Sequence, residues 1–283
     1  MTAATPGPDF AALHRPGHPF LLPNAWDVAS ALLLAHAGFP AVGTTSLGVT
    51  AAAGLVDGAC TGRAHTMAVA VAIVPRLAIP VTVDMEAGYS EDPGAVAELA
   101  AELERLGAAG INLEDAAAGS CGRLRPPDKQ AEIIRAVVAA APRLFVNART
   151  DTYWLGIGPP AGRLADTITR LRAYRDAGAS GVFVPGLTDI SAIATVTAQI
   201  LLPLNVLWRP DQNPEQLAQA GVARVSTGSA PYRRALAAGL ATAVAARDGS
   251  PPPDLDISYD SLVQLLVASE RGPDADSAAE SRA

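Results

Sequence analysis

The amino-acid sequence predicts an α/β protein that folds as a (β/α)8 TIM-type barrel. Short runs rich in Val, Ile and Leu alternate with longer segments rich in Ala, Leu, Glu and Arg, and eight such runs occur between residues 20 and 228. This alternation is typical of a parallel sheet whose faces are covered by helices. The predicted strands are 20–25, 41–45, 80–86, 110–115, 144–150, 181–185, 203–208 and 223–228.

An open, doubly wound parallel sheet is the alternative fold. Such a sheet usually carries a Gly-rich phosphate-binding loop directly after its first strand. Here the sequence PNAWD occupies that place, and neither GxGxxG nor GxxxxGK[ST] occurs in the chain. The barrel is therefore favoured over the open sheet.

The segments between the predicted strands carry helix boundary signals. Segment 92–110 begins with Asp-Pro, a pair that suits the N-cap and first turn of a helix, and Gly107 or Gly110 is expected to end it. Segment 165–179 has the same form, with Gly178 as its expected end. Both segments fit the helices that connect parallel strands.

The chain divides into one large domain and a short extension. Residues 1–250 are expected to form a single barrel domain. The break SPPP at 250–253 precedes a helical extension, 251–270, whose amphipathic part at 258–270 could pack on a neighbouring subunit. Residues 271–283 are small and polar, and we expect them to form a disordered tail.

The composition excludes several classes of protein. The chain of 283 residues has 21 Lys and Arg against 28 Asp and Glu, so its net charge of −7 argues against nucleic-acid binding. No apolar run reaches the length of a membrane span, and the first twenty residues lack the apolar core of a signal peptide. Two cysteines, Cys60 and Cys121, are too few for a disulfide framework. We expect a cytoplasmic protein without a membrane or nucleic-acid partner.

Acidic residues follow several of the predicted strands. Asp84 and Glu86 end the third strand, Glu114 ends the fourth, and Asp57 lies in the long loop after the second. The carboxyl ends of barrel strands meet at one rim, where carboxylates repel one another unless a cation lies among them. Oxygen ligands without His or Cys favour Mg²⁺ or Mn²⁺. The sequence therefore predicts such a metal site.

Two further observations bear on this rim. Strict alternation along the third strand would place Asp84 and Glu86 on the same face, two residues apart. An Asp that follows a strand can instead cap the next helix, and Asp27, Asp92 and Asp151 fit that role as well as a role in a site. Arg149, beside the expected metal, would favour a substrate with two or more negative charges.

Several of these stretches together resemble a known enzyme superfamily. They are LPNAWDVASA, TTSLGVTAAAGLVDG, VTVDMEAGYS, GAAGINLED and VNARTD. The combination is similar to the isocitrate lyase/phosphoenolpyruvate mutase superfamily over residues 10 to 245. Within this superfamily, the combination of DMEAGY and NARTD resembles the phosphonomutase-like, 2-methylisocitrate-lyase-like branch.

The resemblance implies a barrel whose eighth helix is exchanged between the subunits of a homodimer or homotetramer. It also implies Mg²⁺ and a small 2-oxo or 2-hydroxy carboxylate substrate, handled through an enolate. By position, Asp84 would bind the metal directly, and the remaining carboxylates would hold it through water. These are Asp57, Glu86 and Glu114.

The resemblance also implies which residues bind and transform the substrate. The segment Thr45, Ser46 and Leu47 matches the one that holds the carboxylate of the oxo acid. Arg149 would clamp the substrate and stabilise the enolate oxygen, and Glu114 is the third catalytic candidate beside Arg149 and Cys121. An enolate needs such fixed positive charge together with a proton donor or acceptor.

The loop after the fourth strand departs from the lyases of the superfamily. Their Lys-(Lys/Arg)-Cys-Gly-His signature, with Cys as general acid, is replaced by AGSCGR, in which Cys121 and the following Gly remain. Only Arg123 and Arg125 are near enough in sequence to lower the pKa of that thiol. Cys121 is therefore either the general acid or an incidental thiol in a Gly-rich lid.

Four residues are weaker candidates for lining the substrate pocket. Trp26 and Asn24 end the first strand, Tyr89 follows the acidic motif, and Asn205 lies in the seventh strand. Trp26 and Tyr89 could equally serve packing, whereas Asn205 could contact the tail of a substrate.

These observations lead us to expect a Mg²⁺-dependent carbon–carbon lyase. Its substrate would be a 2-hydroxy di- or tricarboxylate such as 2-methylisocitrate or isocitrate, cleaved through the enolate of a 2-oxo acid. The alternatives are a 2-oxo acid hydrolase or decarboxylase, a C–P bond enzyme acting on phosphonopyruvate, and a non-catalytic 2-oxo acid binder.

Overall fold

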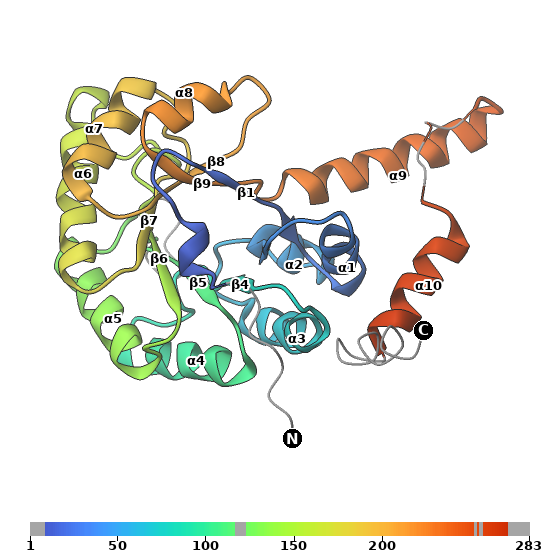
Figure 1. Cartoon of the computed structure of the whole chain (residues 1–283), viewed down its shortest axis with the longest axis horizontal. Helices are drawn as coiled ribbons and strands as arrows, with labels where there is room; N and C mark the ends of the chain where they lie inside the picture. Colours follow the sequence, from blue (N-terminus) through green and yellow to red (C-terminus); the bar gives the residue numbers. More distant parts are fainter. Residues whose placement is uncertain (1–8, 117–122, 252–253, 255–256, 271–283) are drawn as a thin grey trace, which may run out of the picture.

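The computed structural model shows a parallel β-barrel surrounded by helices, with a helical arm reaching away from it (Figure 1). The structure describes residues 9–116, 123–251, 254 and 257–270. Cys121 and the predicted tail at 271–283 lie outside the described residues.

Nine short strands form one sheet in which every pair of neighbours is parallel. The strands are β1 (Phe20–Leu22), β2 (Asn24–Ala25), β3 (Val42–Thr44), β4 (Val81–Asp84), β5 (Gly110–Glu114), β6 (Phe145–Arg149), β7 (Gly181–Phe183), β8 (Leu204–Leu207) and β9 (Val222–Ser226). Because β1 pairs with β9 while β2 pairs with β3, the sheet closes on itself. The barrel prediction is confirmed, and the open sheet is excluded.

The nine strands correspond to the eight predicted runs because the first run is divided at Pro23. Pro23 has no N–H to donate, so the ladder cannot continue through it. The carbonyl of Leu22 accepts from the N–H of Thr227 at 3.0 Å, whereas the carbonyl of Pro23 accepts from the N–H of Gly43 at 2.9 Å. The chain thus changes partner from β9 to β3 at the point where the barrel closes.

Helices follow the strands and form the outer layer of the barrel. They are α1 (Val28–His36), α2 (Ser46–Ala52), α3 (Arg63–Ile73), α4 (Pro93–Leu106), α5 (Pro127–Ala140), α6 (Pro160–Asp176), α7 (Ile190–Ile200), α8 (Pro214–Gln219), α9 (Ala230–Asp248) and α10 (Tyr259–Glu270), with 3₁₀ turns η1 (Ala11–Leu13) and η2 (Val74–Arg76). Helix α4 has the predicted boundaries: Asp92 accepts from the N–H groups of Gly94 and Ala95, and Gly107 adopts φ 101°. Helix α6 starts five residues earlier than expected, at Pro160.

The main hydrophobic core lies between the strands and the helices that cover them. Strand residues such as Val83, Ile111 and Val146 pack against helix residues such as Leu103 and Ile134, and all five are fully or almost fully buried. This layer fixes the strand ends, and hence the rim on which the acidic residues stand.

The C-terminal helices leave the barrel. Helix α9 projects away from it, and α10 returns to lie against α1 of the same chain (Figure 1). Helix α10 falls within the predicted extension 251–270, and three of its apolar residues remain exposed to solvent, namely Val263, Leu266 and Val267. No helix among the described residues is long and apolar enough to cross a membrane.

Candidate functional site

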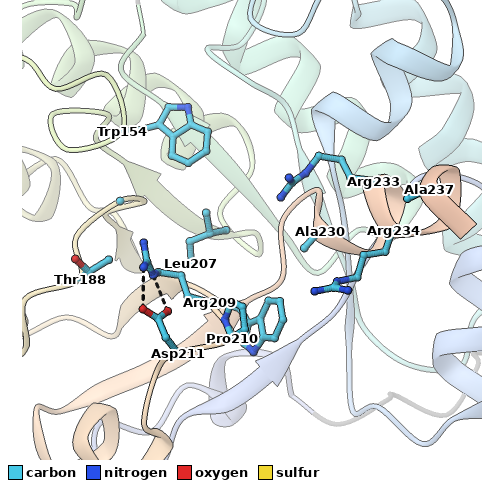
Figure 2. A pocket seen from close by; sticks show the side chains of 12 residues that line it. Trp154, Thr188, Leu207, Arg209, Pro210, Asp211, Ala230, Arg233, Arg234 and Ala237 are labelled. Carbon is cyan, nitrogen blue, oxygen red and sulfur yellow. Dashed lines mark hydrogen bonds and ion pairs between the residues drawn. The ribbon is translucent and has the colours of Figure 1, made fainter.

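A small cavity of about 80 Å³ lies at the carboxyl ends of the strands. Seven predicted residues line it: Asn24, Thr45, Ser46, Leu47, Asp57, Asp84 and Arg149. The other lining residues are Asn112, Trp154, Phe183, Pro185, Leu207, Ser226, Gly228 and Ser229. A larger cavity of about 630 Å³ adjoins it and shares the walls formed by Trp154 and Leu207 (Figure 2).

Asp84 is held in a fixed orientation at the end of β4. Its own N–H donates to Thr44 Oγ1 at 2.8 Å, and its Oδ2 accepts from the N–H of Ser46, the first residue of α2, at 3.1 Å. Its Oδ1 is buried and has no hydrogen-bond partner within the part of the chain that the structure describes. Since a buried carboxylate oxygen is costly without a partner, Oδ1 is suited to bind a cation.

Glu86 reaches the same site by a different route from the one expected. Strand β4 ends at Asp84, two residues earlier than predicted, because Glu86 adopts the left-handed backbone conformation with φ 50°. Strand alternation therefore does not place Glu86 beside Asp84; the turn after the strand does. Both carboxylate oxygens of Glu86 are buried, and neither has a hydrogen bond of good geometry to a described residue, although Tyr89 and the backbone of Gly58 lie near them. Burial, together with the charges of Asp84 and Asp57, raises the pKa of Glu86 to about 7.

Asp57 approaches the site from the loop between α2 and α3. Asp57 is exposed to solvent, yet it lines the small cavity. Desolvation of its carboxyl group and the negative charge of Asp84 raise the pKa of Asp57 above its ordinary value. Asp57 is therefore placed to approach a cation bound at Asp84 from the solvent side.

Arg149 lies at the end of β6 between two carboxylates. Its Nε donates to Asp151 Oδ1 at 2.6 Å and its Nη2 donates to Asp151 Oδ2 at 2.9 Å, while its Nη1 lies 2.9 Å from Glu114 Oε2. Its guanidinium carbon lies 5.7 Å from the ring centre of Phe183. Burial opposes the positive charge, but Asp151 and Glu114 outweigh it and raise the pKa of Arg149. The guanidinium therefore stays charged and fixed.

The carboxylates at this rim outnumber the guanidinium groups near them. The carboxylates are those of Asp57, Asp84, Glu86, Glu114 and Asp151. Burial and the neighbouring negative charges raise the pKa of Glu114 in spite of its contact with Arg149. A divalent cation would relieve this excess of negative charge.

The donor set fits Mg²⁺ or Mn²⁺ bound largely through water. Among the residues that the structure describes, no three Asp, Glu, His or Cys side chains converge closely enough to bind one ion directly. Mg²⁺ usually keeps several of its waters and takes only one or two carboxylates. The unpartnered oxygens of Asp84 and Glu86 are consistent with this mode of binding.

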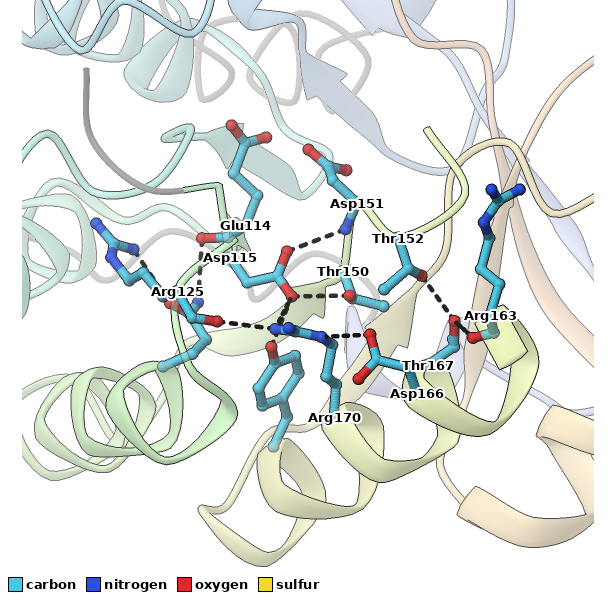
Figure 3. A network of polar contacts seen from close by, with 12 residues as sticks. Glu114, Asp115, Arg125, Thr150, Asp151, Thr152, Arg163, Asp166, Thr167 and Arg170 are labelled. Carbon is cyan, nitrogen blue, oxygen red and sulfur yellow. Dashed lines mark hydrogen bonds and ion pairs between the residues drawn. The ribbon is translucent and has the colours of Figure 1, made fainter. Parts of the chain in front are cut away.

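Asp115, next to Glu114, organises a buried polar network that the sequence analysis did not foresee (Figure 3). Asp115 accepts hydrogen bonds from Thr150 Oγ1 and Tyr174 Oη, both at 2.7 Å, and from the N–H of Asp151 at 3.0 Å; Arg170 Nη1 lies 3.3 Å away. The side chain thus fixes the segment that carries Arg149 and Asp151. Alternation gives the only sequence signal, because it points Asp115 away from the rim that Glu114 faces.

Arg125 belongs to the same buried layer. By its place in the sequence, Arg125 is expected to be near Cys121, which lies outside the described residues. Its guanidinium is 98% buried and donates instead to Glu91, Gln130 and the carbonyls of Ala87 and Ser90. Gln130 in turn donates to the carbonyl of Glu114 at 3.1 Å. Arg125 therefore connects the loop after β4 to the end of β5.

Three predicted pocket residues lie outside the walls of the small cavity. Trp26 packs edge-on against Tyr232 with ring centres 5.3 Å apart, and Tyr89 shares a hydrogen bond of 2.8 Å with Thr66. Asn205 is buried inside the barrel, where its Oδ1 accepts from Ser226 at 3.0 Å. In the structure Trp26 thus makes a packing contact, whereas Tyr89 and Asn205 form hydrogen bonds with neighbouring side chains.

The cavity also includes residues that no sequence motif pointed to. Trp154 and Ser229 come from loops, and Phe183 and Leu207 are the last residues of β7 and β8. Asn24, a weaker candidate, does line the cavity and donates through Nδ2 to the carbonyl of Thr44 at 2.8 Å. These walls depend on loop conformation, which strand and helix patterns do not specify.

Comparison with known proteins identifies the family. The model of the phosphoenolpyruvate phosphomutase family matches residues 10–247. The chain belongs to this family. It therefore lies within the isocitrate lyase/phosphoenolpyruvate mutase superfamily, whose members include lyases, mutases and hydrolases.

Two other proteins are 44% identical to this chain. One is an uncharacterized protein of Mycobacterium tuberculosis (strain ATCC 25618 / H37Rv), aligned over 91% of this chain and 96% of that protein. The other is a crystal structure of a Burkholderia cenocepacia J2315 protein, with a TM-score of 0.78, that covers 84% of this chain and 98% of the other.

Other relatives carry names that state an activity. The 2-methylisocitrate lyase of Bacillus subtilis (strain 168) is 31% identical over 65% of this chain and 60% of its own length. The oxaloacetate decarboxylase of Rhodopseudomonas palustris (strain TIE-1) is 29% identical over 69% and 70%. An oxaloacetate acetylhydrolase in complex with the product oxalate is 25% identical, with a TM-score of 0.81 over 97% and 98% of the two chains.

Proposed function

We propose that this protein is a Mg²⁺-dependent lyase that cleaves a C–C bond in a small 2-hydroxy di- or tricarboxylate, such as 2-methylisocitrate or isocitrate. One observation carries the proposal: unpartnered buried carboxylate oxygens of Asp84 and Glu86 share a small rim with a fixed guanidinium, Arg149. The cavity volume of about 80 Å³ suits a small acid rather than a nucleotide.

Each side of the cavity has a separate role in this reaction. Asp84 would hold the ion directly, with Asp57, Glu86 and Glu114 acting through water. The ion, Mg²⁺ or Mn²⁺, would supply a Lewis acid that stabilises negative charge on the oxygens of the reacting acid. Arg149 adds a second fixed positive charge near the oxygen that becomes the enolate.

The segment before and at the start of α2 would bind the substrate carboxylate. Thr45, Ser46 and Leu47 all line the cavity, and Ser46 opens the helix next to Asp84. The N–H of Ser46 already donates to Asp84, so this segment ties the carboxylate site to the metal site. Asn205 lies deeper in the barrel, and any contact with a substrate tail would require a water or a side-chain movement.

The first experiment measures release of 2-oxo acid from 2-methylisocitrate and isocitrate, with Mg²⁺ and then with EDTA. We expect release of pyruvate or glyoxylate with Mg²⁺ and its loss with EDTA. Oxaloacetate and phosphonopyruvate are assayed in parallel. If neither hydroxy acid releases a 2-oxo acid while oxaloacetate or phosphonopyruvate is turned over, the lyase proposal is refuted and the second candidate takes its place.

The second candidate is a 2-oxo acid hydrolase or decarboxylase. The sequence AGSCGR favours it, because the basic pair and the His of the lyase signature are missing. The oxaloacetate decarboxylase and acetylhydrolase among the relatives also support it. Binding of oxalate without turnover of any of these substrates would instead indicate a non-catalytic binder.

The lyase requires a proton donor, and we propose Cys121. We expect Cys121→Ser to lower the rate of lysis by roughly a hundredfold or more, which is the usual contribution of a general acid, without changing oxalate binding. A Cys60→Ser variant is the matched control. Unchanged turnover in Cys121→Ser would show that another group donates the proton.

We further propose that the enzyme acts in the cytoplasm as a homodimer or homotetramer. The projection of α9 from the barrel supports the assembly.

A further inference from the structure

The larger cavity beside the proposed active site has a distinct chemistry (Figure 2). It has a volume of about 630 Å³ and shares two lining residues, Trp154 and Leu207, with the small cavity. The proposed reaction occupies only the small cavity. The larger cavity is therefore the space next to the small one into which a longer substrate could extend.

Two arginines of the first turns of α9 face this larger cavity. Arg233 and Arg234 both line it, and in Figure 2 their side chains extend from α9 toward the same hollow. Arg233 Nε donates to Ser229 Oγ at 3.3 Å, and Ser229 lines the small cavity. One hydrogen bond therefore links the guanidinium of Arg233 to Ser229, a residue that lines the proposed substrate site.

Within the described residues, neither arginine has an acidic partner. Among the described residues, no carboxylate lies within ion-pair distance of Arg233 or Arg234. On the opposite wall Arg209 donates to both carboxylate oxygens of Asp211, at 3.0 and 2.9 Å, so its charge is compensated. The cavity thus offers two uncompensated positive charges on one wall in a protein whose net charge is −7.

The walls where the two cavities lie side by side are apolar and aromatic. Trp154 is 55% exposed although it lies beside a cavity, and Leu207 and Trp208 line the same space. Such walls suit a short hydrocarbon spacer, whereas a cluster of arginines suits a carboxylate.

We propose that the larger cavity is a subsite for a remote carboxylate of the substrate. The substrate class is then an extended 2-oxo or 2-hydroxy acid that carries a further carboxylate beyond an apolar spacer. The reacting 2-oxo acid end lies in the small cavity, the spacer lies along Trp154 and Leu207, and Arg233 and Arg234 bind the remote carboxylate. This inference rests on the proposed function, which places the 2-oxo acid end.

Paired inert analogues test the subsite. N-(ω-carboxyalkyl)oxamates with two to five methylene groups are compared, by calorimetry in Mg²⁺, with N-alkyl oxamates of the same length, and oxalate serves as the short reference. At the best length we expect the remote carboxylate to strengthen binding about tenfold. In the double variant Arg233→Gln/Arg234→Gln this gain should fall below twofold, with the affinity for oxalate unchanged.

The control variant is Arg247→Gln, at the far end of the same helix, where the arginine is paired with Asp248. It should retain the whole gain. If the remote carboxylate gives no gain at any length, or the gain persists in the double variant, the subsite is refuted while oxalate binding still supports the small site. If oxalate itself fails to bind with Mg²⁺, the proposed function and the subsite fall together.

Discussion

At the scale of single residues, the site depends on which side-chain atoms are left without partners. Asp84 has one oxygen bonded to the N–H of Ser46 and one with no partner. We expect Asp84→Ala to abolish Mg²⁺-dependent oxalate binding, with affinity lowered at least about a hundredfold, because the direct ligand is removed. Calorimetry with oxalate in Mg²⁺ and in EDTA measures this.

A capping aspartate provides the matched control for Asp84. Asp189→Ala removes the N-cap of α7, where the side chain accepts from the N–H of Ala192 at 2.7 Å. It should cost roughly 1 kcal/mol of stability and leave Mg²⁺-dependent binding intact. Tight oxalate binding by Asp84→Ala would refute the metal assignment.

The sequence could not separate caps from site residues among the aspartates that follow strands. Asp27 proves to be the N-cap of α1, with a capping box to Ser30, and Asp92 caps α4. Asp151 caps nothing, since α6 begins only at Pro160, and it binds Arg149 instead. All three have the same local pattern, so only the partner across the rim distinguishes them.

At the scale of elements, the turn after β4 shows where strand periodicity no longer predicts the direction of side chains. Alternation assumes an extended chain, but Glu86 and Tyr89 have positive φ values of 50° and 60°. Gly88 lies between them with φ 84°, and a Cβ there would meet Val96 Cγ1 at 2.5 Å. The packing of this turn on α4 thus determines the direction of Glu86, and strand spacing does not.

Helix α9 presents an apolar stripe away from the barrel. Leu236, Leu240 and Val244, spaced by four residues, are 57%, 67% and 37% exposed. We expect the protein to sediment as a dimer or tetramer in which a second copy covers this stripe, because such an exposed face on a projecting helix is typical of an interface. The variant Leu236→Glu/Leu240→Glu should sediment as a monomer.

The opposite face of α9 supplies the control for that experiment. Thr242→Glu places a charge of the same sign on the other side of the helix and should leave the assembly unchanged. A wild-type monomer by sedimentation velocity would refute both the homo-oligomer and the exchange of a helix between subunits.

At the scale of the whole molecule, the strand and helix patterns predicted the barrel because each βα unit carries its own periodicity. The predicted strands match the observed ones to within a few residues, including the end of β5 at Glu114 and that of β6 at Arg149. The division of the first strand at Pro23 and the polar interior could not be predicted in this way. Both depend on partners about 200 residues away, such as Thr227, whose side chain accepts from the N–H of Asn24.

The amino-terminal segment contributes a buried histidine to the aromatic cluster beside β6. His14 stacks on Phe145 with ring centres 4.0 Å apart, and its Nδ1 lies 2.9 Å from the carbonyl of Phe10. Its Nε2 is buried without a partner. Burial and the positive charge of Arg224 lower the pKa of His14 to about 3. The ring is therefore neutral in the folded protein at pH values where it is protonated in the unfolded chain.

This difference makes global stability depend on pH. Below pH 6.5 the unfolded chain takes up a proton at His14 that the folded protein refuses, so the free energy of unfolding falls as the pH falls from 6.5 toward 3. The loss approaches about 1.4 kcal/mol per pH unit in that window, and above it His14 contributes no slope. Urea unfolding of wild type and of His14→Phe, at pH 7.5, 6.0 and 5.0, measures the difference in slope. His14→Gln replaces the Phe variant if that one fails to fold, and parallel slopes in wild type and variant would show that His14 is protonated equally in both states.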